Sequence, residues 1–201
     1  INISSHILNT TTVSNCTVRI YNETNTSNVF ASLDGNVGTD TICSASFDLQ
    51  YWYNPGDWEV EVYAEAGTNN SSNSTSFYYN ELIGESISTD SILFVGSPGD
   101  TNISASNAFP MIVNNTGNVP INLSLKGTDF IGVSDTNYTI GVRNSTYSLN
   151  ANSGYERLGY NSSHLFTELM PRSTLEVYWK GKIPQGIMSQ DYQSTITIKS
   201  E

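Results

Sequence analysis

Positive charge is scarce in this chain. Only 8 Lys and Arg occur among 201 residues, against 19 Asp and Glu, so the net charge is −11. The cations stand singly, whereas a nucleic-acid site needs clustered Lys and Arg that displace counterions from phosphate. The same clustering is needed to bind anionic lipid surfaces. We therefore expect neither nucleic acid nor an anionic membrane surface as a partner.

Long hydrophobic runs are also lacking. No stretch of about 18 or more apolar residues occurs, so the sequence predicts no direct insertion into a membrane. The chain begins at Ile1 without a Met or an apolar leader, as expected for a processed mature chain or for a shortened one. Hydrophobic residues make up 37% and aromatic residues 11%, which favours a folded chain with a sizeable core over disorder.

Cysteine and histidine, the usual ligands of zinc, are few. The chain has two cysteines, Cys16 and Cys43, and two isolated histidines, His6 and His164, which argues against a metal site of the zinc type. An even cysteine count in an exported chain favours a disulfide over two buried free thiols. In the chain-entropy model, closing a loop of about 28 residues stabilises the fold by 3–4 kcal/mol. We expect a Cys16–Cys43 bridge.

No catalytic arrangement is present either. Glu59 and Glu61 are paired carboxylates, but they lie side by side on the outer face of one predicted strand. A glycosidase needs two carboxyls across a cleft, with their pKa values pushed apart. Serine is abundant without a G-x-S-x-G turn, and Gly-rich phosphate loops are absent. We expect no enzyme activity.

One acidic loop has the ligand types that calcium prefers. Asp34, Asn36 and Asp40 place oxygen atoms in a flexible segment, but without the spacing of an EF-hand or its terminal Glu. Gly, Asn and Asp are also the ordinary residues of a hairpin loop. The hairpin interpretation is favoured, and we expect no calcium cofactor.

An aromatic cluster could stack sugar rings. It consists of Tyr51, Trp52 and Tyr53, with Trp58 a few residues later. Strand alternation directs Tyr51, Tyr53 and Trp58 toward the core and leaves Trp52 pointing outward. Core packing is the favoured role, and a carbohydrate-binding module acting through Trp52 stays an alternative.

In contrast to these absences, acceptor triplets for N-linked glycan are abundant. Random placement of about 23 Asn among the Ser and Thr of this chain would give about six Asn-X-Ser/Thr triplets, and fourteen occur. They begin at Asn2, Asn9, Asn15, Asn22, Asn25, Asn69, Asn70, Asn73, Asn102, Asn114, Asn122, Asn137, Asn144 and Asn161. Glycan is bulky, solubilising and confined to surface positions. The excess predicts a secreted, extracellular protein on the cell surface.

A period of two runs through most of the chain, whereas helical periodicity is almost absent. The clearest case is residues 58–65, with apolar residues at even positions and mainly acidic ones at odd positions. This is typical of a strand with one face in the core and one in water. Further strands are predicted at 13–21, 47–53, 77–79, 91–95, 108–114, 119–126, 174–180 and 194–199. Only 162–169 is expected to form a short helical turn.

Turn residues predict two hairpins, one at 54–57 and one at 115–118. Many short strands at regular spacing indicate an all-β chain of two immunoglobulin-like antiparallel β-sandwich domains. The predicted organisation is an extended N-terminal strand at 1–10, a first sandwich with the disulfide at 11–83, and a second sandwich at 84–201. Residues 69–76, which are only Asn, Ser and Thr, are expected to form a glycosylated loop tip.

The N-terminal segment is short and β-prone. Ile1, Ile3 and Ile7 alternate with polar residues ahead of the first predicted domain strand. Its own domain could absorb the segment as an edge strand. Alternatively, it completes a sheet in the next subunit, supplying backbone hydrogen bonds and apolar side chains to an open edge. Repeated head to tail, such a contact does not close and produces a filament.

Two motifs resemble those of archaeal secreted β-sandwich proteins. The sequence YNPGDWEV at 53–60 resembles their aromatic-x-P-G-x-W-x-V hairpin, and VNNTGNVPI at 113–121 is similar to a V-x-N-x-G-N-x-x-I hairpin of related surface domains. With dense glycan and a strand-like tail, the chain resembles archaeal filament subunits of the thread and bundling-pilus type. It lacks the long apolar N-terminal helix of type IV pilins.

This resemblance implies a structural subunit of a glycosylated surface filament, assembled by strand donation into a head-to-tail homopolymer. Other surface glycoproteins are possible further partners. The alternatives are an S-layer or envelope component, which would form two-dimensional lattices, and an adhesin or carbohydrate-binding module. Composition does not separate these three architectures.

Overall fold

The computed structural model describes residues 1–8, 12–30, 32–34 and 40–201. In this part of the chain, β-strands joined by loops are accompanied by one short 3-10 turn, η1 (Val142–Asn144). Every strand pair is antiparallel, so the predicted all-β fold is confirmed. The chain divides into two compact units, Ile1–Leu82 and Ile83–Glu201, each with its own core.

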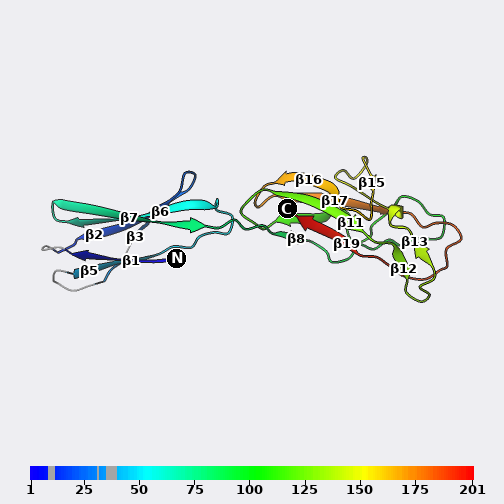
Figure 1. The fold of residues 1–201 in the computed structure, drawn as a ribbon, viewed down its shortest axis with the longest axis horizontal. Coiled ribbons are helices and arrows are strands. Elements are labelled where there is room, and N and C mark those ends of the chain that lie inside the picture. The colour runs from blue at the N-terminus through cyan, green and yellow to red at the C-terminus, as the bar shows by residue number, and fades with distance from the viewer. Residues whose placement is uncertain (9–11, 31, 35–39) are drawn as a thin grey trace. The chain divides into compact units, whose positions relative to one another are not determined.

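Unit 1 is a sandwich of two sheets. Its strands are β1 (Asn2–Leu8), β2 (Asn15–Tyr21), β3 (Thr26–Phe30), β4 (Ser32–Asp34), β5 (Asp40–Ser46), β6 (Gly56–Ala66) and β7 (Asn69–Tyr79). One sheet has the order β1-β5-β4 and the other the order β3-β2-β6-β7. Figure 1 shows β1 and β5 in one layer and β2, β6 and β7 in the other. β1 and β7 are therefore both edge strands.

The core of unit 1 follows from the alternation of β2 and β6. Val18 and Ile20 on β2 and Trp58 and Val60 on β6 are buried, because even positions of both strands face the opposite sheet. The prediction of a strand at 58–65 is confirmed, and so is the one at 13–21. The sequence did not predict β3, β4 or β5, which have weak or no alternation.

The first predicted hairpin is wrong. Residues 47–55 form no strand, and β6 begins at Gly56, so residues 54–57 lead into β6 from a loop. The partner of β6 is β7, reached through a two-residue turn at Gly67 and Thr68, where Gly67 has a φ of 63°. Gly suits this left-handed conformation because it has no Cβ.

The predicted loop tip at 69–76 is also wrong, because these residues belong to β7. All eight side chains are exposed, so no buried position gives this half of the strand an alternating pattern. Its extended conformation comes from pairing with β6 along the complete strand, from Gly56↔Tyr79 to Ala66↔Asn69. The extended conformation of residues 69–76 is therefore determined by pairing with β6 and not by their own sequence pattern.

Unit 2 has three sheets. Its strands are β8 (Glu85–Ile87), β9 (Ile103–Ser104), β10 (Met111–Asn115), β11 (Ile121–Gly127), β12 (Phe130–Gly132), β13 (Thr139–Ile140), β14 (Ser145–Ser148), β15 (Glu156–Arg157), β16 (Ser163–Leu169), β17 (Thr174–Gly181), β18 (Tyr192–Gln193) and β19 (Ile196–Ser200). The orders are β15-β14-β17-β10-β8, with β9 also on β17, then β16-β11-β19, and β13-β12-β18. The core contains Val113 of β10, Leu123 of β11 and Trp179 of β17, all fully buried.

The second predicted hairpin is wrong in its pairing, although the strands predicted at 108–114 and 119–126 are present as β10 and β11. β10 pairs with β17 and β8, whereas β11 pairs with β16 and β19. Residues 116–120 therefore cross from one sheet to another. The side chain of Asn115, which is 1% exposed, holds this crossing. Its Nδ2 donates to Val119 O at 2.8 Å and to Leu169 O at 2.7 Å, and its Oδ1 accepts from Gly117 N at 2.8 Å.

Two smaller predictions also need correction. The helical turn at 162–169 is absent, because Ser163–Leu169 is the strand β16, which contains a register irregularity and a φ of 57° at Glu168. Residues 91–95 are not a strand, although Ile92 and Phe94 pack against the core of unit 2. The strands predicted at 174–180 and 194–199 are confirmed as β17 and β19.

Candidate assembly and glycosylation sites

β1 is an edge strand held by a single neighbouring strand. It pairs with β5 over seven residues, from Asn2↔Ser46 to Leu8↔Asp40. Beyond the strand, the Ile1 amino group donates to Phe47 O at 2.5 Å and Phe47 N donates to Ile1 O at 2.8 Å. In the single chain the N-terminal segment thus completes its own sheet, which is one of the two possibilities left open by the sequence.

The three isoleucines of this segment differ in burial. Ile3 and Ile7 are half-buried and pack against the core of unit 1, whereas Ile1 is 44% exposed. Ile3 and Ile7 are two of the side chains that a neighbouring subunit would have to supply if β1 were missing. The contact of Ile1 is made through its backbone.

A groove lies between β1 and the β6–β7 hairpin. Its volume is about 360 Å³, and Ser5, Ile7, Val62, Ala64 and Asn73 are among its lining residues. The groove runs along the side of unit 1 where the edge strands of the two sheets approach each other. Sequence reasoning missed it, because the polar half of β7 that forms one wall was predicted to be a loop.

Cys16 and Cys43 form a disulfide in the structure. Cys16 lies on β2 and Cys43 on β5, so the bond links the two sheets of unit 1 through the core, with Cα atoms 6.3 Å apart. β5 is also the strand that holds β1. The covalent link therefore fixes the surface on which the N-terminal strand lies.

Nine of the thirteen acceptor asparagines in the described residues are exposed. Six of them are Asn2 on β1, Asn15 on β2, Asn122 on β11, and Asn102, Asn137 and Asn161 in loops. The other three, Asn69, Asn70 and Asn73, lie within five residues on β7. Exposed positions of this kind are accessible to a bulky modification.

Several acceptor asparagines use their side-chain amide in local contacts, including the exposed Asn73 and Asn122, which accept from Ser74 N and Glu168 N. Asn144 is half-buried and its Nδ2 donates to Gly141 O at 2.9 Å. The Nδ2 of Asn25 donates to Thr24 Oγ1 at 2.9 Å, and the Nδ2 of Asn137 donates to Asp135 Oδ1 at 2.9 Å. Asn15 and Asn114 donate to Glu65 and Ser86, and Asn22 accepts from Thr24 N and Asn25 N. Asn9 lies outside the described residues.

The other predicted binding residues are not brought together. Residues 35–39, including Asn36, lie outside the described part of the chain, between Asp34 at the end of β4 and Asp40 at the start of β5. Glu59 and Glu61 stay on the outer face of β6, opposite Tyr21 and Arg19 of β2. Among the described residues, no group of three or more His, Cys, Asp and Glu is arranged to hold a metal ion.

The predicted orientation of the aromatic cluster is partly wrong. Trp58 is buried and donates from Nε1 to Asn54 O at 3.1 Å, but Tyr51 is 43% exposed and Trp52 is half-buried. Strand alternation does not apply here, because residues 47–55 form a loop. Trp52 contacts both Tyr51 and Tyr53 edge-on, with ring centroids 4.9 and 6.3 Å apart.

Tyrosine–carboxylate pairs dominate the electrostatics of the surface. The Tyr160 hydroxyl and Val142 N both donate to Asp129 Oδ1 at 2.7 Å, and these bonds lower the pKa of Asp129 below its ordinary value of 3.8. On β2, a hydrogen bond to Glu59 raises the pKa of the Tyr21 hydroxyl above 10.0. Both shifts come mainly from hydrogen bonds at the surface.

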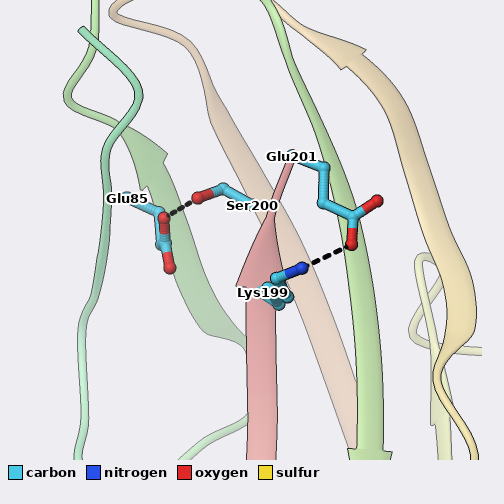
Figure 2. A network of polar contacts seen from close by, with 4 residues as sticks. All are labelled: Glu85, Lys199, Ser200 and Glu201. Carbon is cyan, nitrogen blue, oxygen red and sulfur yellow. Dashed lines mark hydrogen bonds and ion pairs between the residues drawn. The ribbon is translucent and has the colours of Figure 1, made fainter.

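Figure 2 shows a further contact that the sequence did not indicate. The Ser200 hydroxyl at the end of β19 donates to the Glu85 carboxylate at the start of β8. These two strands are the edges of different sheets in unit 2, so the bond ties the sheets together. Lys199 and Glu201 form an exposed ion pair at 2.8 Å, and Glu201 extends the pairing with Asn122 by two backbone bonds of 3.0 Å.

No helix among the described residues has the length and apolar character needed to cross a membrane. No protein-family model matches the chain, and no curated protein matches it. One solved structure, described as "Chaperone-tip adhesin complex is vital for synergistic activation of CFA/I fimbriae biogenesis", contains a chain with 9% identity and a TM-score of 0.36. The match covers 98% of this chain and 83% of that one. A likeness of this degree gives no information on function.

Proposed function

We propose that this chain is the structural subunit of an extracellular, N-glycosylated surface filament of archaeal type, in which β1 of one copy is donated to the next. The observation that carries the proposal is the position of β1. It is an N-terminal edge strand bound to β5 alone in its sheet, so it can leave without breaking any other strand pair.

When β1 leaves its own sheet, the β1 strand of another copy can restore the contacts that are lost. A neighbour's β1 presents the same seven residues to β5 and the same Ile3 and Ile7 to the core of unit 1. Exchange of identical elements is therefore a low-cost route to association, driven by subunit concentration. Donation from each copy to the next is a head-to-tail contact that does not close, so it produces a fibre.

Glycan and the disulfide are consistent with an extracellular location. Nine of the described acceptor asparagines are exposed, and the Cys16–Cys43 bond persists in an oxidising environment. Only 13% of the residues are charged, about half the average of globular proteins, so attached carbohydrate would supply the solubility of the fibre. The role is mechanical, with no enzyme activity.

Cross-linking between two singly substituted copies tests the donation directly. Ser4 on β1 lies opposite Ser44 on β5. When a Ser4→Cys chain and a Ser44→Cys chain are mixed under assembly conditions and oxidised, a disulfide-linked pair forms only if β1 of one copy lies on β5 of the other. Ser4→Cys mixed with Ser76→Cys, on the outer face of β7, is the matched control.

The filament itself is tested by deletion and electron microscopy. Removal of residues 1–8 should leave soluble single chains, whereas Ile3→Val, which keeps an apolar side chain at the core, should still form fibres. Fibres of normal length from the deleted chain would disprove strand donation by β1. Sheets with a two-dimensional lattice would instead favour an envelope layer, and the loss of glycan binding in Trp52→Ala would favour an adhesin.

A further inference from the structure

The first half of β7 is an edge strand without the usual protection. Residues 69–76 are exposed on both faces and include no charged residue, no Pro and no Gly. β7 ends its sheet, so one side of its backbone has no strand partner in the described part of the chain. Exposed edges pair with strands of other molecules unless charge, Pro, a bulge or a covering segment prevents it. This edge therefore needs another form of protection.

The register of β7 on β6 separates its three acceptor asparagines by face. Asn69 lies opposite Ala66 and Asn73 lies opposite Val62, whereas Asn70 lies opposite Glu65. Residues directly opposite each other in an antiparallel pair share one face of the sheet. All three asparagines border the groove, but Asn69 and Asn73 share a face of the sheet with Ala66 and Val62, whereas Asn70 is on the opposite face.

We propose that an N-linked sugar on Asn73 lies in the groove between β1 and the β6–β7 hairpin and covers the free edges of both sheets. This inference rests on the glycosylation in the proposed function and does not need strand exchange. Its occupant is carbohydrate attached to this chain, and the position of Asn73 in the groove wall identifies it.

The composition of the groove suits a sugar ring. Val62, Ala64 and Ala66 give it an apolar floor that can pack against the C–H face of a pyranose. Ser5 on β1 and Ser71 on β7 add hydroxyl groups that can bond to sugar hydroxyls. The volume of about 360 Å³ lies within the range of small-molecule pockets. An apolar base with a few polar groups is the general form of such sites.

The sugar would decide how copies of the chain associate. A strand that adds to β7 or to the free edge of β1 must enter the space that the Asn73 sugar fills. The sugar would therefore block edge-to-edge pairing, and it would leave the β1–β5 contact untouched. A glycan on Asn70 projects from the opposite face and gives no such protection.

The test compares two variants in a form that cannot exchange β1. Ser4→Cys with Ser44→Cys in the same chain, oxidised at low concentration and isolated as a single chain without reducing agent, locks β1 to its own β5. It also removes the Asn2 triplet identically in all samples. In this form, Asn69→Gln/Asn73→Gln clears their shared face of β7 and keeps the Asn70 triplet, whereas Asn70→Gln keeps the Asn69 and Asn73 triplets. Chains from a glycosylating host are compared by light scattering after chromatography, with occupancy measured by peptide mass spectrometry.

We expect the Asn69→Gln/Asn73→Gln variant to shift from the mass of one chain to that of two or more, and the Asn70→Gln variant to stay a single chain. When the same variants come from a host without N-glycosylation, their mass in solution must equal that of the unsubstituted locked chain from that host. This control excludes an effect of the substitution itself. NMR contacts between the sugar and the methyl groups of Val62 and Ala64 should be present in the glycosylated chain. Three results would each overturn the inference and leave the filament proposal intact. They are equal masses for the two variants, a sugar on Asn70 but none on Asn73, and the absence of these NMR contacts.

Discussion

Among individual side chains, Asp129 makes the best-defined polar contact of the surface. It accepts hydrogen bonds from Val142 N, at the start of η1, and from the Tyr160 hydroxyl, both at 2.7 Å. The ionised carboxylate is the better acceptor, so the pKa of Asp129 is lowered, and the same carboxylate raises the pKa of Tyr160. Asp129 thus joins the loop after β11 to two later segments of unit 2.

The sign of the pH dependence follows from these shifts. Because the pKa of Asp129 is lower in the folded chain, its contribution to stability is present above its ordinary value of 3.8 and disappears as the pH falls through the lowered pKa. We predict that Asp129→Asn reduces the acid dependence of the unfolding free energy below about pH 4. Denaturant unfolding at a series of pH values measures this dependence.

The same substitution should also lower the pKa of Tyr160, because the neighbouring carboxylate that disfavours phenolate is lost. The difference in ultraviolet absorbance between each chain and its Tyr160→Phe counterpart isolates this titration from the other tyrosines. An unchanged titration of Tyr160 in Asp129→Asn would show that the hydrogen bond does not form in solution.

Strand patterns in the sequence were informative where a strand has one buried and one exposed face. β6, β11 and β17 bury alternate residues, and all three were predicted. The alternation shows which residues of a strand face the core, but it does not show which strands are its neighbours in the sheet. The turn residues near Pro55 and Gly117 were therefore assigned to hairpins that do not form, because strand pairing is decided by packing across the complete unit.

Strands without a buried face could not be predicted in the same way. The first half of β7 has polar, exposed side chains on both faces, so its sequence is indistinguishable from that of a loop. The groove beside it was missed for the same reason. By contrast, the alternation of Ile1, Ile3 and Ile7 predicts an N-terminal strand and leaves open whether its own sheet or that of another subunit takes it. In the structure, Ile3 and Ile7 pack against the core, whereas Ile1 is exposed.

The crossing between β10 and β11 depends on one buried amide. Asn115 satisfies two carbonyl groups and one backbone N–H, which link the crossing to the end of β16. We predict that Asn115→Ala lowers the unfolding free energy of unit 2 by about 2–4 kcal/mol, because buried polar groups lose their partners. Thermal unfolding followed by tryptophan fluorescence, to which Trp179 in the same core contributes, measures the change.

Asn115→Asp provides a second variant of nearly equal shape. A carboxylate accepts from Gly117 N but donates nothing to Val119 O or Leu169 O, so it should also destabilise unit 2. Asn114→Gln is the matched control when all variants come from a host without N-glycosylation, since its side chain is half-buried and donates to Ser86. A stability of Asn115→Ala equal to that of the control would show that the crossing is held by other contacts.

Across the complete chain, low charge density and abundant acceptor triplets point to one physical solution for solubility. With 13% charged residues, unit 1 and unit 2 both depend on Asn, Ser and Thr at the surface. Carbohydrate adds hydration without adding charge, and it extends further from the surface than a side chain. Its distribution should follow the exposure and the hydrogen bonds of each asparagine.

For the glycosylated subunit proposed above, we predict that glycan occupancy separates two classes of acceptor. Asn161 is exposed and should be modified, whereas Asn144 should stay bare. The amide of Asn144 is half-buried and donates to Gly141 O at 2.9 Å, so attachment of a sugar would require η1 to unfold locally. Peptide mass spectrometry before and after enzymatic release of the glycan measures each site separately. Modified Asn144 beside bare Asn161 would mean that sugar is attached before unit 2 folds, since in that case the folded surface would not determine which sites are accessible.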